Sequence, residues 1–268
     1  MPLYENSAVA PVISSRTNSR VKQLRAAFAG HARLSGGMVG IEGDHLLEEA
    51  LRSGMVLKTV FVSEQREIPK AIPRSIEVLR LTNDLFKSIV ETQSPQGIAA
   101  LLVPPIHKIE AMLQGTPLIL IAAGLQDPGN LGTLVRSAEA FGATGVLITP
   151  GSVSPWNQKA LRASVGSIFR TPVVAATEDE ITALKSHDIK LIAAVGREPS
   201  GTVAAQEMNL TRPCALMIGN EGAGLSAEWM KLADEHVTIP CPGPVESLNA
   251  AVAGSLLLYE ASRQRSQR

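Results

Sequence analysis

The sequence predicts an α/β protein: a C-terminal, mainly parallel sheet with helices on both faces, preceded by a small α/β domain. The first observation is that short apolar runs alternate with helix-like segments from residue 117 onward, an order typical of parallel sheets. The second is that three glycine-rich turns follow strand candidates in this half. The third is a break at Pro104 and Pro105, because adjacent prolines interrupt helices and strands. A chain of 268 residues is long enough for two modest domains.

The first half is expected to hold a flexible arm over residues 1–14, a small α/β domain over 15–103 and a linker over 104–116. Asp44 is expected to cap the second helix of this domain, and Gly54 to end it. The expected helices cover 17–29, 44–52 and a segment from Thr82 or Asn83 to 90, and the expected strands cover 38–41, 59–62, 76–81 and 98–103.

The second half, residues 117–268, is expected to form the larger domain. Its first strand candidate, 118–122, is continuously apolar, as strands covered on both faces are. The expected strands cover 118–122, 145–149, 190–195, 215–218 and 237–239, and the expected helices cover 130–141, 157–165, 181–186 and 247–263.

Composition limits the classes of function that the chain can have. The 25 basic and 25 acidic residues cancel, so the whole chain is not a polycation, and aromatics at 3% do not supply a stacking platform for bases. Charge is nevertheless unevenly distributed, since only Glu5 opposes the basic residues of the first 35 positions. Those basic residues are Arg16, Arg20, Lys22, Arg25 and Arg33. They form either a solvated helix face or a phosphate-contacting surface.

Two cysteines, Cys214 and Cys241, predict neither a disulfide framework nor a metal site. The first residues lack the apolar core of a signal peptide, and the apolar runs at 117–123 and 189–195 are too short to span a membrane. The sequence therefore predicts a cytoplasmic protein without a membrane or metal partner.

The first glycine-rich motif runs from Gly124 to Val146. Pro128 and Gly129 predict a tight turn after the strand, and Asn130 is expected to cap the helix that follows. Arg136 lies six residues further on, so the two side chains leave the helix in different directions. Either they converge on one ligand through a bent arginine, or Asn130 is only a cap and Arg136 only solvated.

The second motif, residues 216–226, has glycines at 219, 222 and 224. This spacing differs from the dinucleotide fingerprint, and the phosphate-loop lysine is absent. Such a loop can offer backbone amides and carbonyls to an adenosine-type ligand, or it can be an ordinary turn.

The third motif runs from Ile239 to Glu260. A Pro-Gly-Pro loop leads into a helix rich in alanine and glycine, with Ser247 and Asn249 at its expected start. Free backbone N–H groups gather at such a start. The alternative is a C-terminal helix that is simply tightly packed.

In this order and spacing, the three motifs resemble the signature motifs of the SpoU–TrmH family of the SPOUT superfamily, over residues 117–262. The first half resembles the ribosomal-protein-like substrate-binding domain that often precedes this domain. The resemblance implies a deep trefoil knot, which general topology rules would not propose, and a homodimer. It implies S-adenosylmethionine as cofactor, bound largely through the backbone by Gly219, Ile239 and Leu248, with Val195 as a further candidate.

The resemblance also implies the catalytic residues. The family's polar active-site positions correspond to Asn130, Arg136, Glu221, Ser247 and Asn249. Arg162 corresponds to a position near the substrate, and Arg136 is expected to contact RNA as well. Arg20 and Lys22, from the basic residues of the first 35 positions, are the further residues expected to contact RNA. Asn130 and Ser247 are expected to orient the ribose, and Glu221 and Asn249 to shape the loops.

The expected function is transfer of a methyl group from S-adenosylmethionine to a ribose 2′-hydroxyl of RNA, with 23S ribosomal RNA favoured. The alternatives are a tRNA 2′-O-methyltransferase and a non-catalytic RNA-binding or assembly protein on the same scaffold. A nucleotide-dependent enzyme is disfavoured, since the phosphate-binding fingerprints are missing. Arg136 is expected to bind phosphate and stabilise a developing alkoxide, because a guanidinium is a poor base.

Overall fold

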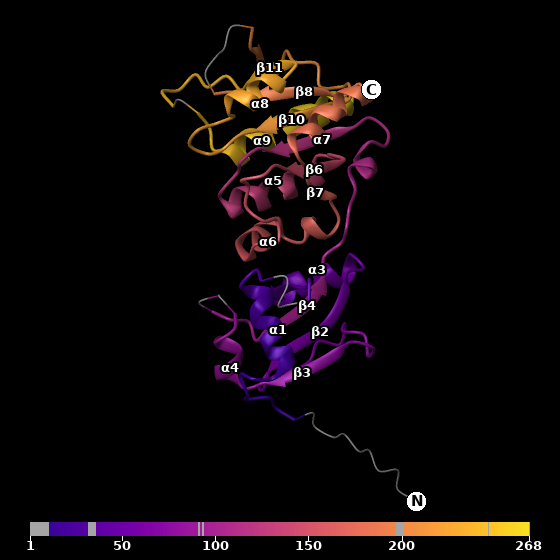
Figure 1. Ribbon diagram of the computed structural model, residues 1–268, viewed down its shortest axis with the longest axis vertical. Coiled ribbons are helices and arrows are strands. Elements are labelled where there is room, and N and C mark those ends of the chain that lie inside the picture. The colour runs from indigo at the N-terminus through magenta and orange to yellow at the C-terminus, as the bar shows by residue number, and fades with distance from the viewer. Residues whose placement is uncertain are drawn as a thin grey trace, which may run out of the picture. The chain divides into compact units, whose positions relative to one another are not determined.

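The computed structural model describes residues 11–31, 36–90, 92, 94–196, 201–245 and 247–267 (Figure 1). The chain forms two compact units, residues 1–105 and 106–268. No helix of the described residues is long and apolar enough to cross a membrane.

A four-stranded mixed sheet forms the centre of the N-terminal unit, in the order β1–β4–β2–β3. β4 pairs antiparallel with both β1 and β2, whereas β2 and β3 are parallel. The strands are β1 (Val39–Glu42), β2 (Val56–Ser63), β3 (Glu77–Leu81) and β4 (Ile98–Val103).

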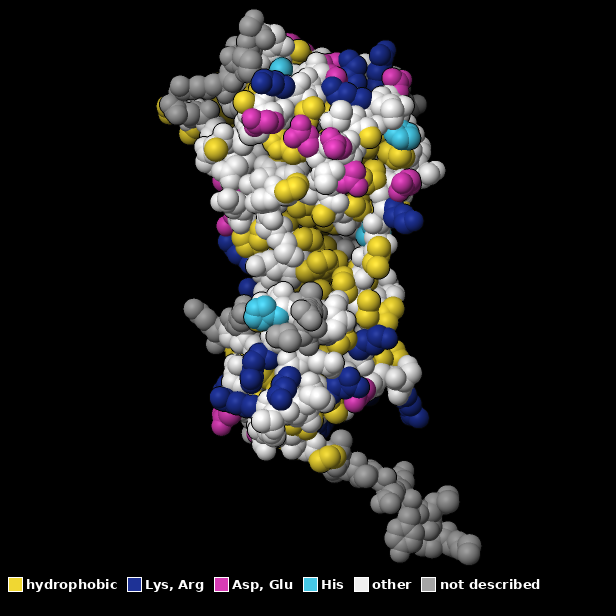
Figure 2. Space-filling model, viewed as in Figure 1, with side chains coloured by type: hydrophobic (Ala, Val, Ile, Leu, Met, Phe, Trp, Pro, Cys, Tyr) yellow, Lys and Arg dark blue, Asp and Glu magenta, His cyan; other side chains and the backbone are white. Residues whose placement is uncertain are grey.

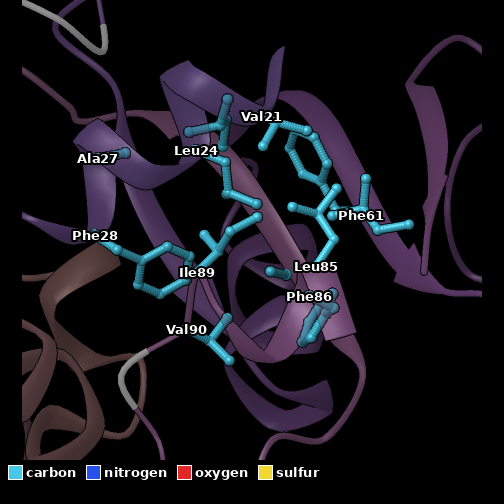
Figure 3. Close-up of a cluster of buried hydrophobic side chains, with 12 residues drawn as sticks. Val21, Leu24, Ala27, Phe28, Phe61, Leu85, Phe86, Ile89 and Val90 are labelled. Atoms are coloured by element: carbon cyan, nitrogen blue, oxygen red, sulfur yellow. The ribbon is translucent and has the colours of Figure 1, made fainter. Parts of the chain in front are cut away.

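In the described part of this unit, helices α1 (Ser19–Phe28), α3 (Asp44–Arg52) and α4 (Asn83–Lys87) accompany the sheet. α1 and α4 pack their apolar sides against β2 and β4, where Leu24, Phe61 and Phe86 are almost fully buried (Figure 3). The periodic apolar positions of α1 therefore face the core, and its basic residues are left for the surface.

Two expectations for this unit need correction. Asp44 is the first residue of α3, not its cap; the N-cap is Gly43, whose φ of 100° suits glycine. The end of the expected flexible arm is attached, because Ile13 forms a parallel bridge with Leu81 and its N–H donates to the carbonyl of Arg80 at 2.8 Å. Residues 1–10 of the arm lie outside the described residues.

The C-terminal unit is built on a seven-stranded sheet in the order β7–β6–β5–β10–β8–β11–β9. Every pairing within it is parallel, which agrees with the expected α/β fold. The strands are β5 (Leu118–Ala122), β6 (Gly145–Ile148), β7 (Val173–Ala175), β8 (Lys190–Ala194), β9 (Val203–Ala204), β10 (Cys214–Ile218) and β11 (Glu235–Thr238).

Helices cover both faces of this sheet (Figure 1). On one face, alternate residues such as Ile121 and Met217 pack with Ile181 of α7 (Glu178–Ala183) and Trp229 of α8 (Ala227–Leu232). On the other, Ile218 lies close to Gly254 of the C-terminal helix. The helices of this second group are α5 (Pro128–Ala140), α6 (Gln158–Ser164), which packs on α5, and α9 (Ala250–Arg265). The unit also contains the short 3₁₀ segments Ile109–Met112, Ser167–Phe169 and Leu184–His187.

Two helix starts differ from the expectation. α5 begins at Pro128 with Asp127 as its N-cap, and the Asp127 carboxylate accepts a hydrogen bond from the N–H of Asn130 at 3.0 Å. Proline suits the first helical position because its missing N–H would have no partner there. α9 begins at Ala250 with Asn249 as its N-cap, so Ser247 lies in the preceding loop and not in the helix.

The short strands β7 and β9 were not expected. They contain only three and two residues, too few for a periodic pattern. Pairing with β6 and β11 is what makes them strands.

Candidate active site

A pocket of about 880 Å³ lies beyond the carboxyl ends of β8, β10 and β11, the edge at which parallel sheets bind ligands. Its volume falls within the range of small-molecule sites, roughly 300–1,000 Å³. All four residues expected to bind the cofactor, Val195, Gly219, Ile239 and Leu248, line it. They come from three different loops, so tertiary folding brings them to one cavity.

The loop after β10 folds back on itself at the pocket wall. The N–H and carbonyl of Asn220 bond to the carbonyl and N–H of Gly224 at 3.0 and 2.9 Å. A Cβ on Gly219 would overlap with backbone atoms of Gly224 and Leu225. Gly224 itself has a φ of 70°, which favours glycine. The glycines of the second motif thus allow the backbone segments at 219–220 and 224–225 to lie in close contact.

Asn220 holds this loop and was missed by the sequence reasoning. Its Oδ1 accepts the N–H groups of Gly222 and Ala223 at 2.9 and 3.1 Å, and its Nδ2 donates to the carbonyl of Gly124 at 3.0 Å. An asparagine two residues before a glycine in a loop is a signal of this local turn. The bond to Gly124 has no local signal, because 96 residues separate the two positions.

Glu221 ties the second motif to the first. Its carboxylate accepts the N–H groups of Gln126 and Asp127 at 3.2 and 3.0 Å and the Nδ2 of Asn130 at 3.0 Å. Desolvation by itself raises the pKa of Glu221, but the hydrogen bonds from Asn130 and from the backbone together outweigh it and lower the pKa. Glu221 is therefore held as a carboxylate and not as a proton donor.

Asn130 and Asn249 extend this network to the third motif. The Nδ2 of Asn249 donates to Oδ1 of Asn130 at 3.1 Å. The Oδ1 of Asn249 accepts the N–H groups of Ala251 and Val252 at 2.9 and 3.2 Å and so caps α9. The chain Glu221–Asn130–Asn249 consequently joins the three motifs, which lie far apart in the sequence, into one cluster beside the pocket.

The remaining predicted catalytic and RNA-binding residues lie outside this hydrogen-bond network. Ser247 lines the pocket and is exposed. Arg136 on α5 and Arg162 on α6 are exposed, and no hydrogen bond or ion pair joins either side chain to another described residue. In the N-terminal unit, Arg20 forms an ion pair with Glu77 at 3.0 Å, whereas Lys22 is exposed.

The pocket's charge suits a cation better than a phosphate. Of the described residues that line it, none is lysine, arginine or histidine, and two are acidic, Glu207 and Glu221. S-adenosylmethionine carries a sulfonium, an ammonium and a carboxylate group and so one net positive charge, which fits the charge of the cavity as its size fits the volume. A phosphate-bearing nucleotide would lack a cationic partner among these residues. Within the described ranges, no cluster of three His, Cys, Asp or Glu side chains could hold a metal ion.

Several pocket residues were not anticipated. Thr202 lies just before β9, Ala204 within it and Glu207 in the turn after it, and Cys241 belongs to the loop after β11. Since β9 itself was not expected, nothing in the local pattern indicated that this segment borders the site.

Comparison with known proteins identifies the family. Residues 117–259 match the model of the SpoU rRNA Methylase family, and residues 18–100 match the MRM3-like substrate binding domain. A curated relative from Bacillus subtilis, 23S rRNA (guanosine(2553)-2′-O)-methyltransferase RlmP, is 35% identical over 92% of this chain and 97% of its own length. The 23S rRNA (uridine(2479)-2′-O)-methyltransferase of Streptomyces viridochromogenes is 30% identical over 97% of this chain and 95% of its own.

Solved structures agree with these relatives. The crystal structure of the SpoU methyltransferase AviRb from Streptomyces viridochromogenes, in complex with the cofactor AdoMet, superimposes with a TM-score of 0.82 and 28% identity. It covers 93% of this chain and 98% of the other. The three motifs around one pocket, the parallel sheet and the match over more than half of the chain lead to one conclusion: this protein belongs to the SpoU rRNA methylase family.

Proposed function

We propose that this protein transfers a methyl group from S-adenosylmethionine to a ribose 2′-hydroxyl of RNA, and that 23S ribosomal RNA is its substrate. The observation that carries the proposal is the network Glu221–Asn130–Asn249, which gathers the three family motifs beside one pocket of cofactor size. A scaffold that only bound RNA would not need a cavity enclosed by these loops.

The relatives support ribosomal RNA over tRNA. The names of the Bacillus subtilis and Streptomyces viridochromogenes relatives both specify 23S rRNA and 2′-O-methylation, but one specifies a guanosine and the other a uridine. The ribose is therefore the shared target, and the base differs between members of the family.

Different pocket residues bind the cofactor and orient the ribose in this proposal. Bound S-adenosylmethionine supplies an electrophilic methyl group on sulfur. We assign its binding to Val195, Gly219, Ile239 and Leu248, largely through backbone groups. Ser247, exposed in the pocket wall, is suited to hydrogen-bond the ribose. Holding the 2′-oxygen in line with the methyl group, about 3 Å away, can supply several kcal/mol.

Asn130 acts differently from the expectation in this proposal. Its amide donates to Glu221 and accepts from Asn249, so both of its functional groups already serve the loops. We therefore assign Asn130, with Glu221 and Asn249, to positioning the pocket and not to orienting the ribose.

Arg136 remains the candidate for transition-state stabilisation. Its exposed guanidinium makes no hydrogen bond or ion pair with another described residue, so it is available to RNA. A guanidinium does not accept a proton. Its proposed role is to bind the phosphate next to the target ribose and to stabilise the oxygen as its proton leaves. Arg162 on α6, which packs on α5, is assigned to RNA as well.

The N-terminal unit is proposed to bind the RNA substrate, as its match to a substrate-binding domain suggests. On the face shown in Figure 2, lysine and arginine side chains predominate over acidic ones in this unit. Lys22 is exposed and unpaired among the described residues, whereas Arg20 must exchange Glu77 for a phosphate. An RNA substrate and this cofactor also support the cytoplasmic location that we propose.

We further propose the trefoil knot and the homodimer that the family resemblance implies. After β11 the chain returns across the sheet, and α9 packs against β10 and α5, a path that a threaded C-terminal segment would take. α9 also leaves Val252, Leu256 and Tyr259 exposed, as a helix at a dimer interface would.

Arg136 provides the sharpest test of the mechanism. Replacing Arg136 with Ala is expected to lower kcat by a factor on the order of 10²–10³, while the Kd for S-adenosylmethionine stays unchanged. Arg136→Lys keeps the positive charge but loses the planar guanidinium that donates two parallel hydrogen bonds to a phosphate. It is therefore expected to recover only part of the rate. The control is Lys231→Ala, which removes an exposed cation from α8. Normal methylation of RNA by Arg136→Ala would remove this residue from the mechanism.

The function itself is tested by calorimetry and by mapping. Titration with S-adenosylmethionine should release or absorb heat; none at millimolar cofactor would favour a non-catalytic RNA-binding protein. Ribose methylation is then mapped in RNA from cells with and without this protein. Loss of one 2′-O-methyl group in 23S rRNA is expected, whereas a loss confined to tRNA would overturn the assignment of the substrate.

A further inference from the structure

We propose that Glu207 makes the pocket selective for the positively charged cofactor S-adenosylmethionine over its neutral product, S-adenosylhomocysteine. This inference rests on the proposed function and adds a specificity-determining residue to it. Glu207 is part of none of the three motifs and was not expected near the site.

Glu207 is placed at the pocket by β9. This strand pairs in parallel with β11, and the N–H of Ala205 donates to the carbonyl of Thr238 at 2.8 Å. A turn follows at once, in which the N–H of Glu207 donates to the carbonyl of Ala204 at 2.9 Å. Glu207 therefore lies just beyond the carboxyl edge of the sheet, where it lines the same cavity as Val195 and Ile239.

The two carboxylates of the pocket are not equivalent. Glu221 accepts three hydrogen bonds from Gln126, Asp127 and Asn130, at the start of α5, which compensate its charge locally. Glu207 is exposed, and its side chain makes no hydrogen bond or ion pair with another described residue. No basic side chain of the described pocket lining offsets it. Among the described residues that line the cavity, Glu207 is thus the negative charge that no other side chain compensates.

The ligand's charge changes during the proposed reaction. S-adenosylmethionine carries a sulfonium, an ammonium and a carboxylate, which leaves one net positive charge. When the methyl group leaves, the sulfur becomes a neutral thioether, and the product has no net charge. A carboxylate at the pocket wall attracts the first ligand more strongly than the second, because only the first carries the sulfonium charge. It therefore favours cofactor binding and product release together.

Calorimetry on the full chain at low salt tests this inference with three ligands. They are S-adenosylmethionine, S-adenosylhomocysteine and sinefungin, which carries an amine in place of the sulfonium and has no methyl group to transfer. Glu207→Gln is expected to raise the Kd of both cationic ligands by about three- to tenfold. The Kd of S-adenosylhomocysteine should change by less than about twofold, because no net charge is involved. Glu207→Asp should keep most of the selectivity.

The matched control is Glu178→Gln, which removes an exposed carboxylate from α7, outside the pocket lining. It should leave all three Kd values unchanged. Added salt should weaken the binding of S-adenosylmethionine by the wild type more than by Glu207→Gln.

The outcomes separate this inference from the proposed function. Wild-type protein that binds none of the ligands would overturn both. Wild-type binding of S-adenosylmethionine with an unchanged Kd in Glu207→Gln would overturn only the role of Glu207. Equal weakening of all three ligands, or sinefungin behaving like the neutral product, would overturn selection by charge.

Discussion

Asn130 shows how one side chain can connect segments that are distant in the sequence. Its amide is bonded to Glu221 on one side and to Asn249 on the other, across 91 and 119 residues. Amide groups suit such a position because they donate and accept at once. A complete network of this kind stabilises the fold by more than the sum of its separate hydrogen bonds suggests.

Replacing Asn130 is expected to open the pocket. Asn130→Ala removes both bonds, at a cost of roughly 1–3 kcal/mol in unfolding free energy, and should raise the Kd for S-adenosylmethionine. Asn130→Asp should be worse, because it places an oxygen where the donor to Glu221 stood and brings two carboxylates together. Calorimetry and thermal unfolding measure both effects.

Asn83→Ala is the control, since the side chain of Asn83 makes no hydrogen bond to another described residue. An Asn130→Asp variant that bound the cofactor as well as Asn130→Ala would contradict the proposed network.

The lowered pKa of Glu221 predicts how stability depends on pH. Desolvation opposes the shift, but hydrogen bonds from Asn130 and the backbone hold the pKa below its usual range. Glu221 therefore contributes stability above the pKa it has in the unfolded chain, and this contribution is lost as pH falls through the lower folded pKa. The stability difference between wild type and Glu221→Gln should shrink as pH is lowered from neutrality to about 3. A constant difference in urea unfolding across this range would contradict the prediction.

At the scale of elements, α5 sets the geometry of the site because it packs against both α6 and α9. Ser137 of α5 and Ser255 of α9 share a hydrogen bond of 2.7 Å, and Gly254 lets Leu134 approach α9 closely. Glycine at 132 plays the same role toward α6, since a Cβ there would overlap with the carbonyl oxygen of Ala160.

Gly132→Ala is expected to push α6 away from α5. The overlap is with backbone atoms of Ala160 and Ser164 and with the Cβ of Ala163, which cannot move by a change of rotamer, and overpacking of this kind costs about 1–3 kcal/mol. Arg162 would move with α6 away from Arg136, so the KM for RNA should rise while the cofactor still binds. Thr133→Ala, at the neighbouring exposed position of α5, should change unfolding free energy by less than about 0.5 kcal/mol. Equal unfolding free energies of Gly132→Ala and Thr133→Ala would show that α6 does not pack so closely against α5 at Gly132.

At the scale of the whole molecule, α9 presents an apolar stripe. Val252, Leu256 and Tyr259 are 47%, 43% and 51% exposed, and spacings of four and three residues place them on one helix face. The opposite side of α9 buries Leu257, Leu258 and Ala261 in the core. The stripe therefore remains for a second copy of the chain to cover in the homodimer that we propose.

Leu256→Arg is expected to convert the proposed homodimer into monomers, because a buried and unpaired charge at such an interface costs several kcal/mol. Sedimentation equilibrium at micromolar concentration measures the change. Ile68→Arg places the same charge on an exposed apolar residue of the other unit and should leave the mass unchanged. A wild type that sediments as a monomer would overturn the dimer.

The sequence by itself determined three features. They are the alternation of apolar runs with helix-like segments that predicts a parallel sheet, the interruption of this pattern near Pro104, and the glycine-rich turns at the carboxyl ends of the strands. These features are local, because periodicity and turn chemistry act over a few residues. The residues expected at the cofactor came from the resemblance of the three motifs to the SpoU–TrmH family, and they line one pocket because parallel strands end at one edge of their sheet.

Tertiary structure alone decided which residues complete the site. The order β5–β10–β8–β11–β9 makes loops from distant segments adjacent, and pairing turns 203–204 into the strand that carries Glu207 to the pocket. Tertiary structure also places the Asn130 amide between Glu221 and Asn249, whereas the capping of α5 by Asp127 is a local contact over three residues. Hydrogen bonds between residues about a hundred positions apart cannot be predicted from local sequence patterns, because they depend on the path of the chain between the two residues.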